Sequence, residues 1–223
     1  MPNRPELSTV YTLLKRSVDM GRKLGQEEII LVMDLAVYAK AQEILWKQQE
    51  EFTHVVLRMG AFHTSMTFLA VLGKRFGDAG LSDLLVEADV VAAGSLQGVI
   101  EGRQYNRAMR AHKTVMEGMQ RLRLVSFKKW MISTGKEDDL MTKDELDSVC
   151  EHLSADTVSA LVASTKFKHL MELFGEFCES DRGPLATLWD SYIDLVCMLL
   201  RFTRATREGN WDLHLSSIHQ MLP

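Results

Sequence analysis

The sequence predicts a mostly α-helical protein with a small α/β element, in which an N-terminal βαβ-like unit is followed by a helical bundle. Two short apolar runs, residues 29–33 and 54–59, lie on either side of one helical segment, a pattern that favours two parallel strands. From residue 104 onward the apolar residues recur at helical spacing. Hydrophobic residues make up 46% of the 223 residues, which is too many for a disordered chain.

The first part of the chain predicts alternating helices and strands. Val10, Leu14 and Val18 follow helical spacing, and Gly25 supplies a stop signal after them. Ile29 to Met33 is a continuous apolar run with β-branched residues, which is typical of a buried strand. The expected elements are a helix over 8–24, a strand over 29–33, a helix over 35–51, a strand over 54–59, a helix over 62–76 and a turn at 77–80.

The second part predicts helices alone. Thr142 with Glu145 forms a capping-box pattern, and Pro184 suits the first turn of a helix. The polar link at 133–141 predicts a division into an α/β portion with a long basic helix, 1–132, and a helical C-terminal portion, 133–223. The expected helices cover 105–130, 142–153, 156–178, 184–206 and 212–221.

A sheet of two strands is not stable without cover or additional partners. The sequence therefore leaves two arrangements open. Either helices cover both faces of the sheet, or the two strands belong to a larger sheet whose other strands lie elsewhere.

Charge and cysteine usage limit the class of protein. The net charge is -4, so the chain as a whole has no field that attracts nucleic acid or an anionic membrane. The three cysteines, Cys150, Cys178 and Cys197, lack metal-ligand spacing and lie in apolar helical patterns. They predict buried, reduced thiols in an intracellular protein, cytoplasmic or nuclear.

Targeting and catalytic motifs are absent from the sequence. The N-terminus has no signal-peptide pattern, and the apolar stretch at 185–202 contains Asp190 and Asp194, so a core helix is expected there and no membrane span. There is no phosphate-binding glycine loop, nucleophile elbow or paired-cysteine zinc pattern. Enzyme classes that depend on these motifs are disfavoured, and the sequence leaves open whether the chain is an enzyme.

Polar residues follow both predicted strands. Asp34 comes directly after the first strand, and Gly60 and His63 follow the second. Because open parallel sheets bind ligands at the carboxyl ends of their strands, Asp34 and His63 are candidate catalytic residues. The Asp34 carboxylate is also a candidate ligand for a divalent metal. The structural alternative is that Asp34 caps the following helix and that His63 is a satisfied polar residue in the first turn of its own helix.

A basic stripe is predicted along the helix over 105–130. At about 100° per residue, five cations fall within about 60° of one another, and the apolar residues occupy the opposite side. The stripe is a candidate nucleic-acid-binding surface. Alternatively, the acidic segment at 137–151 folds back against it, or its charges face solvent. His112, on the apolar side, is expected to be a core histidine. The five cations of the basic stripe are Arg103, Arg107, Arg110, Arg121 and Lys128.

Four stretches are distinctive in combination: VMDLAVYAKAQEI, VVLRMGAFHTSMTFLAVLGKRFGDAGL, VIEGRQYNRAMRAHK and LLRFTRATREGNWDLHL. They resemble a large, uncharacterised family of mobile-element-derived, transposon-associated animal proteins, and the resemblance extends from about Thr9 to Pro223. In that group the equivalent of Asp34 is usually followed by glutamine, whereas this chain has Leu35. They also continue past the equivalent of Pro223, so the resemblance implies a truncated chain.

The resemblance adds an enzymatic interpretation of Asp34. In a transposase-like ancestor, Asp34 would be the first metal carboxylate of a ribonuclease-H-like core that uses two metal ions. The other carboxylates are not assigned in this sequence. If they lie downstream of Pro223, the chain is inactive by itself.

Three functions follow from these observations. The first is a mobile-element-derived domain that associates with nucleic acid and is not catalytically competent alone. The second is a helical protein-interaction module whose basic stripe docks an acidic protein partner, the chain's own acidic segment or the downstream region of a longer homologue. The third is the remnant of a metal-dependent phosphodiester enzyme that uses Asp34. The substrate, partner and oligomeric state do not follow from the sequence.

Overall fold

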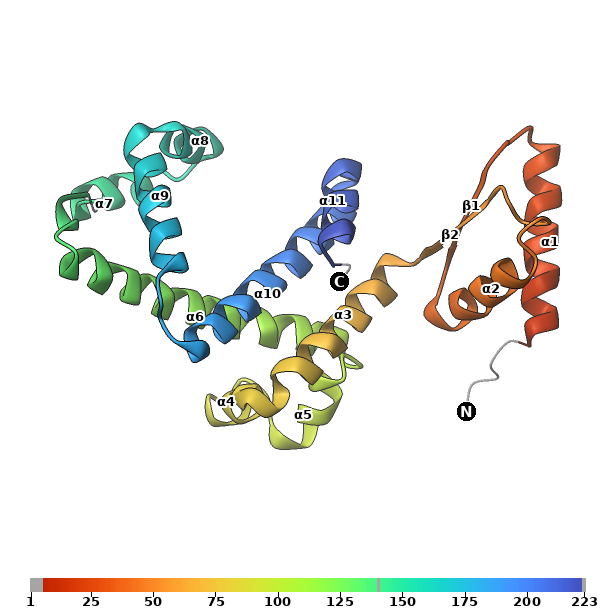
Figure 1. The fold of residues 1–223 in the computed structure, drawn as a ribbon, viewed down its shortest axis with the longest axis horizontal. Coiled ribbons are helices and arrows are strands. Elements are labelled where there is room, and N and C mark those ends of the chain that lie inside the picture. The colour runs from red at the N-terminus through yellow and green to blue at the C-terminus, as the bar shows by residue number, and fades with distance from the viewer. Residues whose placement is uncertain (1–5, 140, 222–223) are drawn as a thin grey trace. The chain divides into compact units, whose positions relative to one another are not determined.

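A computed structural model describes residues 6–139 and 141–221, and the fold is mostly helical with one small parallel sheet, as predicted (Figure 1). The chain divides into two compact units, Met1–Met109 with Met198–Pro223, and Arg110–Cys197. The boundary predicted after residue 132 falls inside the second unit. Two long helices, α6 (Tyr105–Ser133) and α10 (Pro184–Glu208), contribute residues to both units, so no linker marks the division in the sequence.

The two strands lie where the sequence predicts them. β1 (Ile29–Met33) and β2 (Val55–Met59) are parallel, and their register places Met33 opposite Met59. α1 (Leu7–Lys23) precedes β1, and α2 (Leu35–Lys47) connects the two strands. The shared direction of the strands brings the residues that follow them, Asp34 and Gly60, to the same edge.

One face of the sheet is buried and the other is exposed. α1 and α2 pack against Ile29 and Val55 in a single hydrophobic cluster. On the opposite face, Ile30, Val32 and Val56 are 58%, 63% and 44% exposed. Within the part of the chain that the structure describes, helices therefore cover the second face only in part, at its carboxyl end, where Trp211 and His214 lie against Arg58.

The first unit continues with helices that the sequence predicts only in part. α3 (Ala61–Phe76) ends in a π-helical turn (Gly77–Leu81), in which Gly80 has φ +106°. Two short helices follow, α4 (Ser82–Glu87) and α5 (Ala93–Ile100). Neither is predicted, because six and eight residues are too few to display a helical period. The unit is completed by the start of α6, the end of α10 and α11 (Trp211–Met221).

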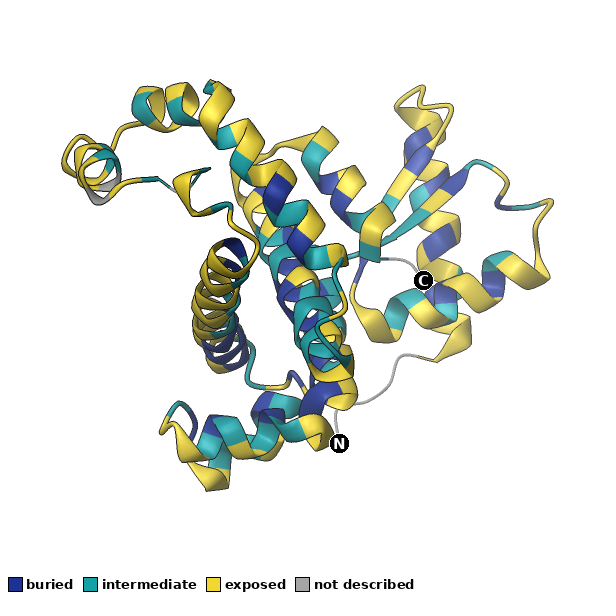
Figure 2. Cartoon of the chain, turned by 60° about the vertical axis from the view of Figure 1, so that its left-hand side comes forward, coloured by how far each residue is buried: buried dark blue, intermediate teal, exposed yellow. Residues whose placement is uncertain are grey.

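The second unit contains the rest of α6 and α10 together with a 3₁₀ turn (Glu137–Asp139), α7 (Lys143–Glu151), α8 (Ala155–Ala163) and α9 (Thr165–Glu179). The single helix predicted over 156–178 is wrong, because Ser164 adopts an extended conformation and its side chain caps α9. The capping box of Thr142 and Glu145 is confirmed, and Pro184 begins α10 as expected. Along the helices, buried and exposed residues alternate as amphipathic packing requires (Figure 2).

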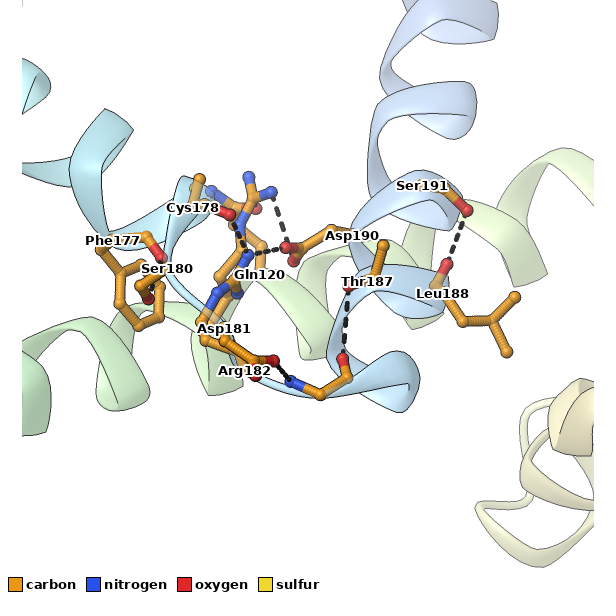
Figure 3. A network of polar contacts seen from close by, with 12 residues as sticks. Gln120, Phe177, Cys178, Ser180, Asp181, Arg182, Thr187, Leu188, Asp190 and Ser191 are labelled. Carbon is orange, nitrogen blue, oxygen red and sulfur yellow. Dashed lines mark hydrogen bonds and ion pairs between the residues drawn. The ribbon is translucent and has the colours of Figure 1, made fainter.

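An ion-pair network connects α6 and α10 within the second unit (Figure 3). Arg123 Nη1 lies 3.6 Å from Asp190 Oδ1, and Arg182 pairs with the other oxygen of the same carboxylate. The two guanidinium groups lie over the rings of Phe174 and Phe177. Asp190 thus has two cationic partners.

Among the helices of the described residues, none combines the length and the apolarity needed to cross a bilayer.

The predicted burial of the three cysteines is wrong. Cys150 is exposed, and Cys178 and Cys197 are partly exposed. Cys150 lies on α7, none of whose described residues is buried, so its apolar pattern does not correspond to a core position. The partial burial of Cys178 raises the pKa of its thiol.

Candidate functional site

Asp34 and Gly60 lie at the shared carboxyl edge of β1 and β2. The backbone N–H of Gly60 donates to the carbonyl of Met33 at 2.8 Å, so the residues that follow the two strands are adjacent. Asp34 is exposed, and its Oδ1 accepts the backbone N–H of Val37 at 2.9 Å. Asp34 is therefore the N-cap of α2, and the structural alternative for this residue is confirmed.

His63 is partly exposed in the first turn of α3, with its ring 5.6 Å from that of Phe62. Among the contacts of the described residues, none joins His63 to Asp34. Within the same part of the chain, no group of three or more His, Cys, Asp and Glu side chains is arranged to hold a metal ion. The catalytic role of Asp34 and His63 and the metal role of Asp34 remain predictions. A metal centre uses several converging ligands, and the described residues do not supply them around Asp34.

The five cations of the basic stripe fall into two groups. Arg103 lies before α6 and pairs with Glu101, and Arg107 Nη1 donates to Ser95 Oγ at 3.0 Å. The other three are exposed and form no ion pair with any side chain that the structure describes. At 1.5 Å per residue they extend over about 27 Å of α6. These three residues, hereafter the free stripe, are Arg110, Arg121 and Lys128.

The acidic segment after α6 makes its contacts elsewhere. Glu145 pairs with Lys166 at 2.8 Å, and Asp139 lies 3.6 Å from His169. Across the described part of residues 137–151, no carboxylate pairs with the free stripe. The alternative in which this segment folds back and neutralises the stripe is therefore not found there.

Apolar residues lie beside these cations on the second half of α6. Leu122, Leu124, Val125 and Ile132 are 48% to 63% exposed. At 100° per residue, Val125 and Ile132 fall on the same side of the helix as the free stripe. The exposed side of α6 thus combines positive charge with apolar side chains.

The opposite side of α6 is buried, as predicted. His112 is 1% exposed, and its Nδ1 lies 2.9 Å from the hydroxyl oxygen of Tyr192. Burial lowers the pKa of His112 to about 4 and raises the pKa of Tyr192. The expectation of a core histidine is confirmed.

A third arrangement, which the sequence does not predict, lies beside β2. Arg58 Nη2 is 2.8 Å from Nε2 of His214 on α11, and the guanidinium lies over the ring of Trp211, 4.5 Å from its centroid. A guanidinium can only donate, so Nε2 of His214 accepts, and Nδ1–H donates to Thr206 Oγ1 at 3.2 Å. Burial, followed by the charge of Arg58, lowers the pKa of His214, which favours this neutral form.

These residues line a cavity of about 240 Å³. Its polar lining includes Arg58 and Asn210, and its apolar lining includes Val32 and Trp211. Arg58 interrupts the apolar run at 54–59, which is the only signal of the site in the sequence. Its partner His214 lies 156 residues away, and a single sequence gives no basis for pairing them.

The architecture defines a mostly α-helical protein that carries a small parallel α/β element near its N-terminus. The chain belongs to the family described as a domain of unknown function (DUF8702), whose family model matches residues 2–223. A comparison with curated proteins gives no match, and a comparison with solved structures gives none either.

Proposed function

We propose that this chain is a nucleic-acid-binding domain that contacts the phosphate backbone through the free stripe of α6. One observation supports this: three exposed cations lie on one side of a continuous helix without an acidic partner among the described side chains. Arg110 and Arg121 are separated by about 16.5 Å along the axis, and Arg121 and Lys128 by about 10.5 Å. The three cations therefore engage separate phosphates, and each contact releases a condensed counterion.

The proposal includes descent from a mobile element, which rests on the four sequence stretches given above. It assigns no catalytic step to Asp34 or His63. Asp34 is occupied as a helix cap, and the described residues provide no cluster of carboxylates around it. Binding without catalysis by this chain alone is the function that these contacts favour.

The test is a fluorescence anisotropy titration of labelled double-stranded and single-stranded DNA and RNA at several salt concentrations. Three phosphate contacts predict a slope of about -2.7 in log K against log salt concentration for duplex DNA. A variant with Arg110→Gln, Arg121→Gln and Lys128→Gln is expected to lose most of this slope and most of its affinity. Absence of binding at about 50 mM salt would contradict the proposal, because non-specific electrostatic binding is strong at that ionic strength.

A matched control separates this surface from net charge. The variant with Arg75→Gln, Arg204→Gln and Lys47→Gln removes the same number of arginines and lysines from exposed positions outside α6. It is expected to keep the affinity and salt slope of the wild-type chain. If both triple variants weaken binding equally, the free stripe is not the binding surface.

A second candidate is a protein-interaction module, which the exposed apolar residues of α6 favour. An acidic amphipathic partner would contact these residues and the free stripe together. Replacement of Leu124, Val125 and Ile132 by Ser would then abolish partner or self-association in size-exclusion chromatography. Under the nucleic-acid proposal, the same variant keeps its affinity for nucleic acid and its salt slope.

A further inference from the structure

We propose that the cavity between the end of β2 and α11 binds a small molecule that carries a compact oxyanion, with Arg58 as the anion-binding residue. This site lies on different elements from the free stripe and does not depend on the proposed nucleic-acid function. The proposal rests on an arginine that has no carboxylate partner among the described residues, on the cavity beside it and on the position of both at the carboxyl end of a parallel strand pair.

Among the described side chains, no carboxylate neutralises the positive charge of Arg58. Its polar partner is the imidazole of His214, and no described carboxylate forms an ion pair with it. A guanidinium carries five N–H donors, and the contact with His214 uses one. The guanidinium carbon lies over the ring of Trp211, and no other hydrogen-bond partner of the Arg58 side chain is found among the described residues. The remaining donors match the geometry of a carboxylate or phosphate, which arginine binds through paired hydrogen bonds.

His214 and Thr206 hold Arg58 in this orientation. His214 is 7% exposed, and its Nε2 accepts from Arg58 while its Nδ1–H donates to the Thr206 hydroxyl. The Thr206 hydroxyl donates in turn to the carbonyl of Phe202 at 2.9 Å. This chain of donors fixes the tautomer of His214. The guanidinium is thus positioned before any ligand arrives, which lowers the entropic cost of binding.

The cavity limits the size and character of the ligand. Its volume, about 240 Å³, is below the usual range of about 300–1,000 Å³ for drug-sized ligands. Val32, Met59 and Ala205 give it apolar walls. Asn210 supplies an amide whose Oδ1 already accepts the N–H of Leu213, so its NH₂ group is available to an anion. We therefore expect a small acid with an apolar body.

Open α/β sheets place ligands outside the carboxyl ends of their strands, and Arg58 is the penultimate residue of β2. The proposed site lies at the edge where the sequence predicts one, but it uses different residues. In place of Asp34 and His63, the cavity uses Arg58 from the strand itself and residues of the α10–α11 corner.

Isothermal titration calorimetry with inorganic phosphate and with sodium benzoate, each against sodium chloride at matched ionic strength, tests the site. We expect either anion to bind saturably, with a dissociation constant of about 1 mM or lower. Arg58→Gln should weaken it about tenfold or more, and Arg58→Lys, which keeps the charge without the fork, should weaken it less. Binding of phosphate alone assigns a phosphate ester, and binding of benzoate alone assigns a carboxylate.

Arg75→Gln is the control, because Arg75 also lies over an aromatic ring in the first unit but lines no part of this cavity. Circular dichroism melts identify a temperature at which every variant is folded, and the titrations are made there. The proposal is overturned if neither anion binds saturably to the wild-type chain. It is also overturned if folded Arg58→Gln binds as tightly as Arg75→Gln does.

Discussion

The imidazole Nδ1 of His112 lies 2.9 Å from the hydroxyl oxygen of Tyr192, and both side chains are almost completely buried. The two residues come from α6 and α10, so this contact joins the two long helices inside the second unit. Its burial has a consequence for stability, because a charged imidazole cannot be accommodated there without loss of solvation.

The first prediction is that acid destabilises the protein through His112. Its pKa is about 6.5 ordinarily and about 4 in the folded chain, so the unfolded chain binds a proton first as the pH falls. Neutral His112 contributes on the order of 3 kcal/mol to the free energy of unfolding. This contribution is fully present above about pH 6.5 and is lost progressively as the pH falls to about 4. Urea unfolding between pH 7 and pH 4.5 measures this slope.

His112→Phe is expected to flatten the pH dependence of the unfolding free energy over this range, whatever its effect at pH 7. His152→Phe is the control, because His152 is exposed and its replacement should leave the slope as it is in the wild-type chain. Equal slopes in wild type and His112→Phe would show that His112 does not carry the effect.

The second prediction concerns Asp190, which neutralises Arg123 and Arg182 at a site where both arginines are mostly buried. Asp190→Asn removes the charge and leaves two guanidinium groups without a counterion, so we expect a loss of about 3–5 kcal/mol in unfolding free energy. Asp194→Asn, four residues later on the same helix at an exposed position, should change stability by less than about 0.5 kcal/mol. Urea titrations at pH 7 compare the two.

Adding Arg182→Met to Asp190→Asn removes one of the uncompensated charges and should recover part of the lost stability. The interpretation fails if Asp190→Asn and Asp194→Asn have equal effects.

Features that depend on neighbouring residues could be predicted from the sequence. The apolar run at Ile29–Met33 marks β1 with its observed bounds, and Asp34 before a helical segment marks the cap of α2. Thr142 and Glu145 form their capping box because both partners lie within one turn. The prediction that the strands are parallel is also confirmed. It could be made because a helical segment lies between them, which is typical of parallel strand connections.

Features that depend on distant residues could not be predicted. The helical wheel placed Arg107 with Arg110, but only the fold brings Ser95 within hydrogen-bond distance of Arg107. The pairing of Arg58 with His214 likewise depends on how α11 meets the sheet. For these arginines, the residue type and its spacing indicate where a positive charge lies. They do not indicate whether another side chain forms a hydrogen bond or an ion pair with it.

The third prediction distinguishes the capping role of Asp34 from a role that needs its charge. Asp34→Ala removes the acceptor for the Val37 N–H and should cost about 1 kcal/mol of unfolding free energy. Asn is as good an N-cap as Asp, so Asp34→Asn should cost much less. Urea unfolding at pH 7 measures both. If Asp34→Asn costs as much as Asp34→Ala, the negative charge itself is required, and capping alone does not account for the residue.

The fourth prediction uses two helical glycines whose replacement by alanine should have opposite effects. An added Cβ at Gly73 of α3 would lie 1.9 Å from the backbone carbonyl oxygen of Ile100 at the end of α5, so the two helices must move apart. Gly73→Ala should therefore destabilise the protein by about 1–3 kcal/mol. At Gly118 of α6, an added Cβ meets no atom within 4 Å.

Gly118→Ala should stabilise the protein by about 0.5–1 kcal/mol, because alanine has less backbone freedom to lose on folding. Thermal and urea unfolding of both variants give the sign directly. If intrinsic helix propensity alone decided the outcome, both substitutions would increase the stability of the protein. Only the close packing of α3 on Ile100 predicts a loss of stability for Gly73→Ala. A stabilised Gly73→Ala would mean that the two backbones do not approach as closely as this packing requires.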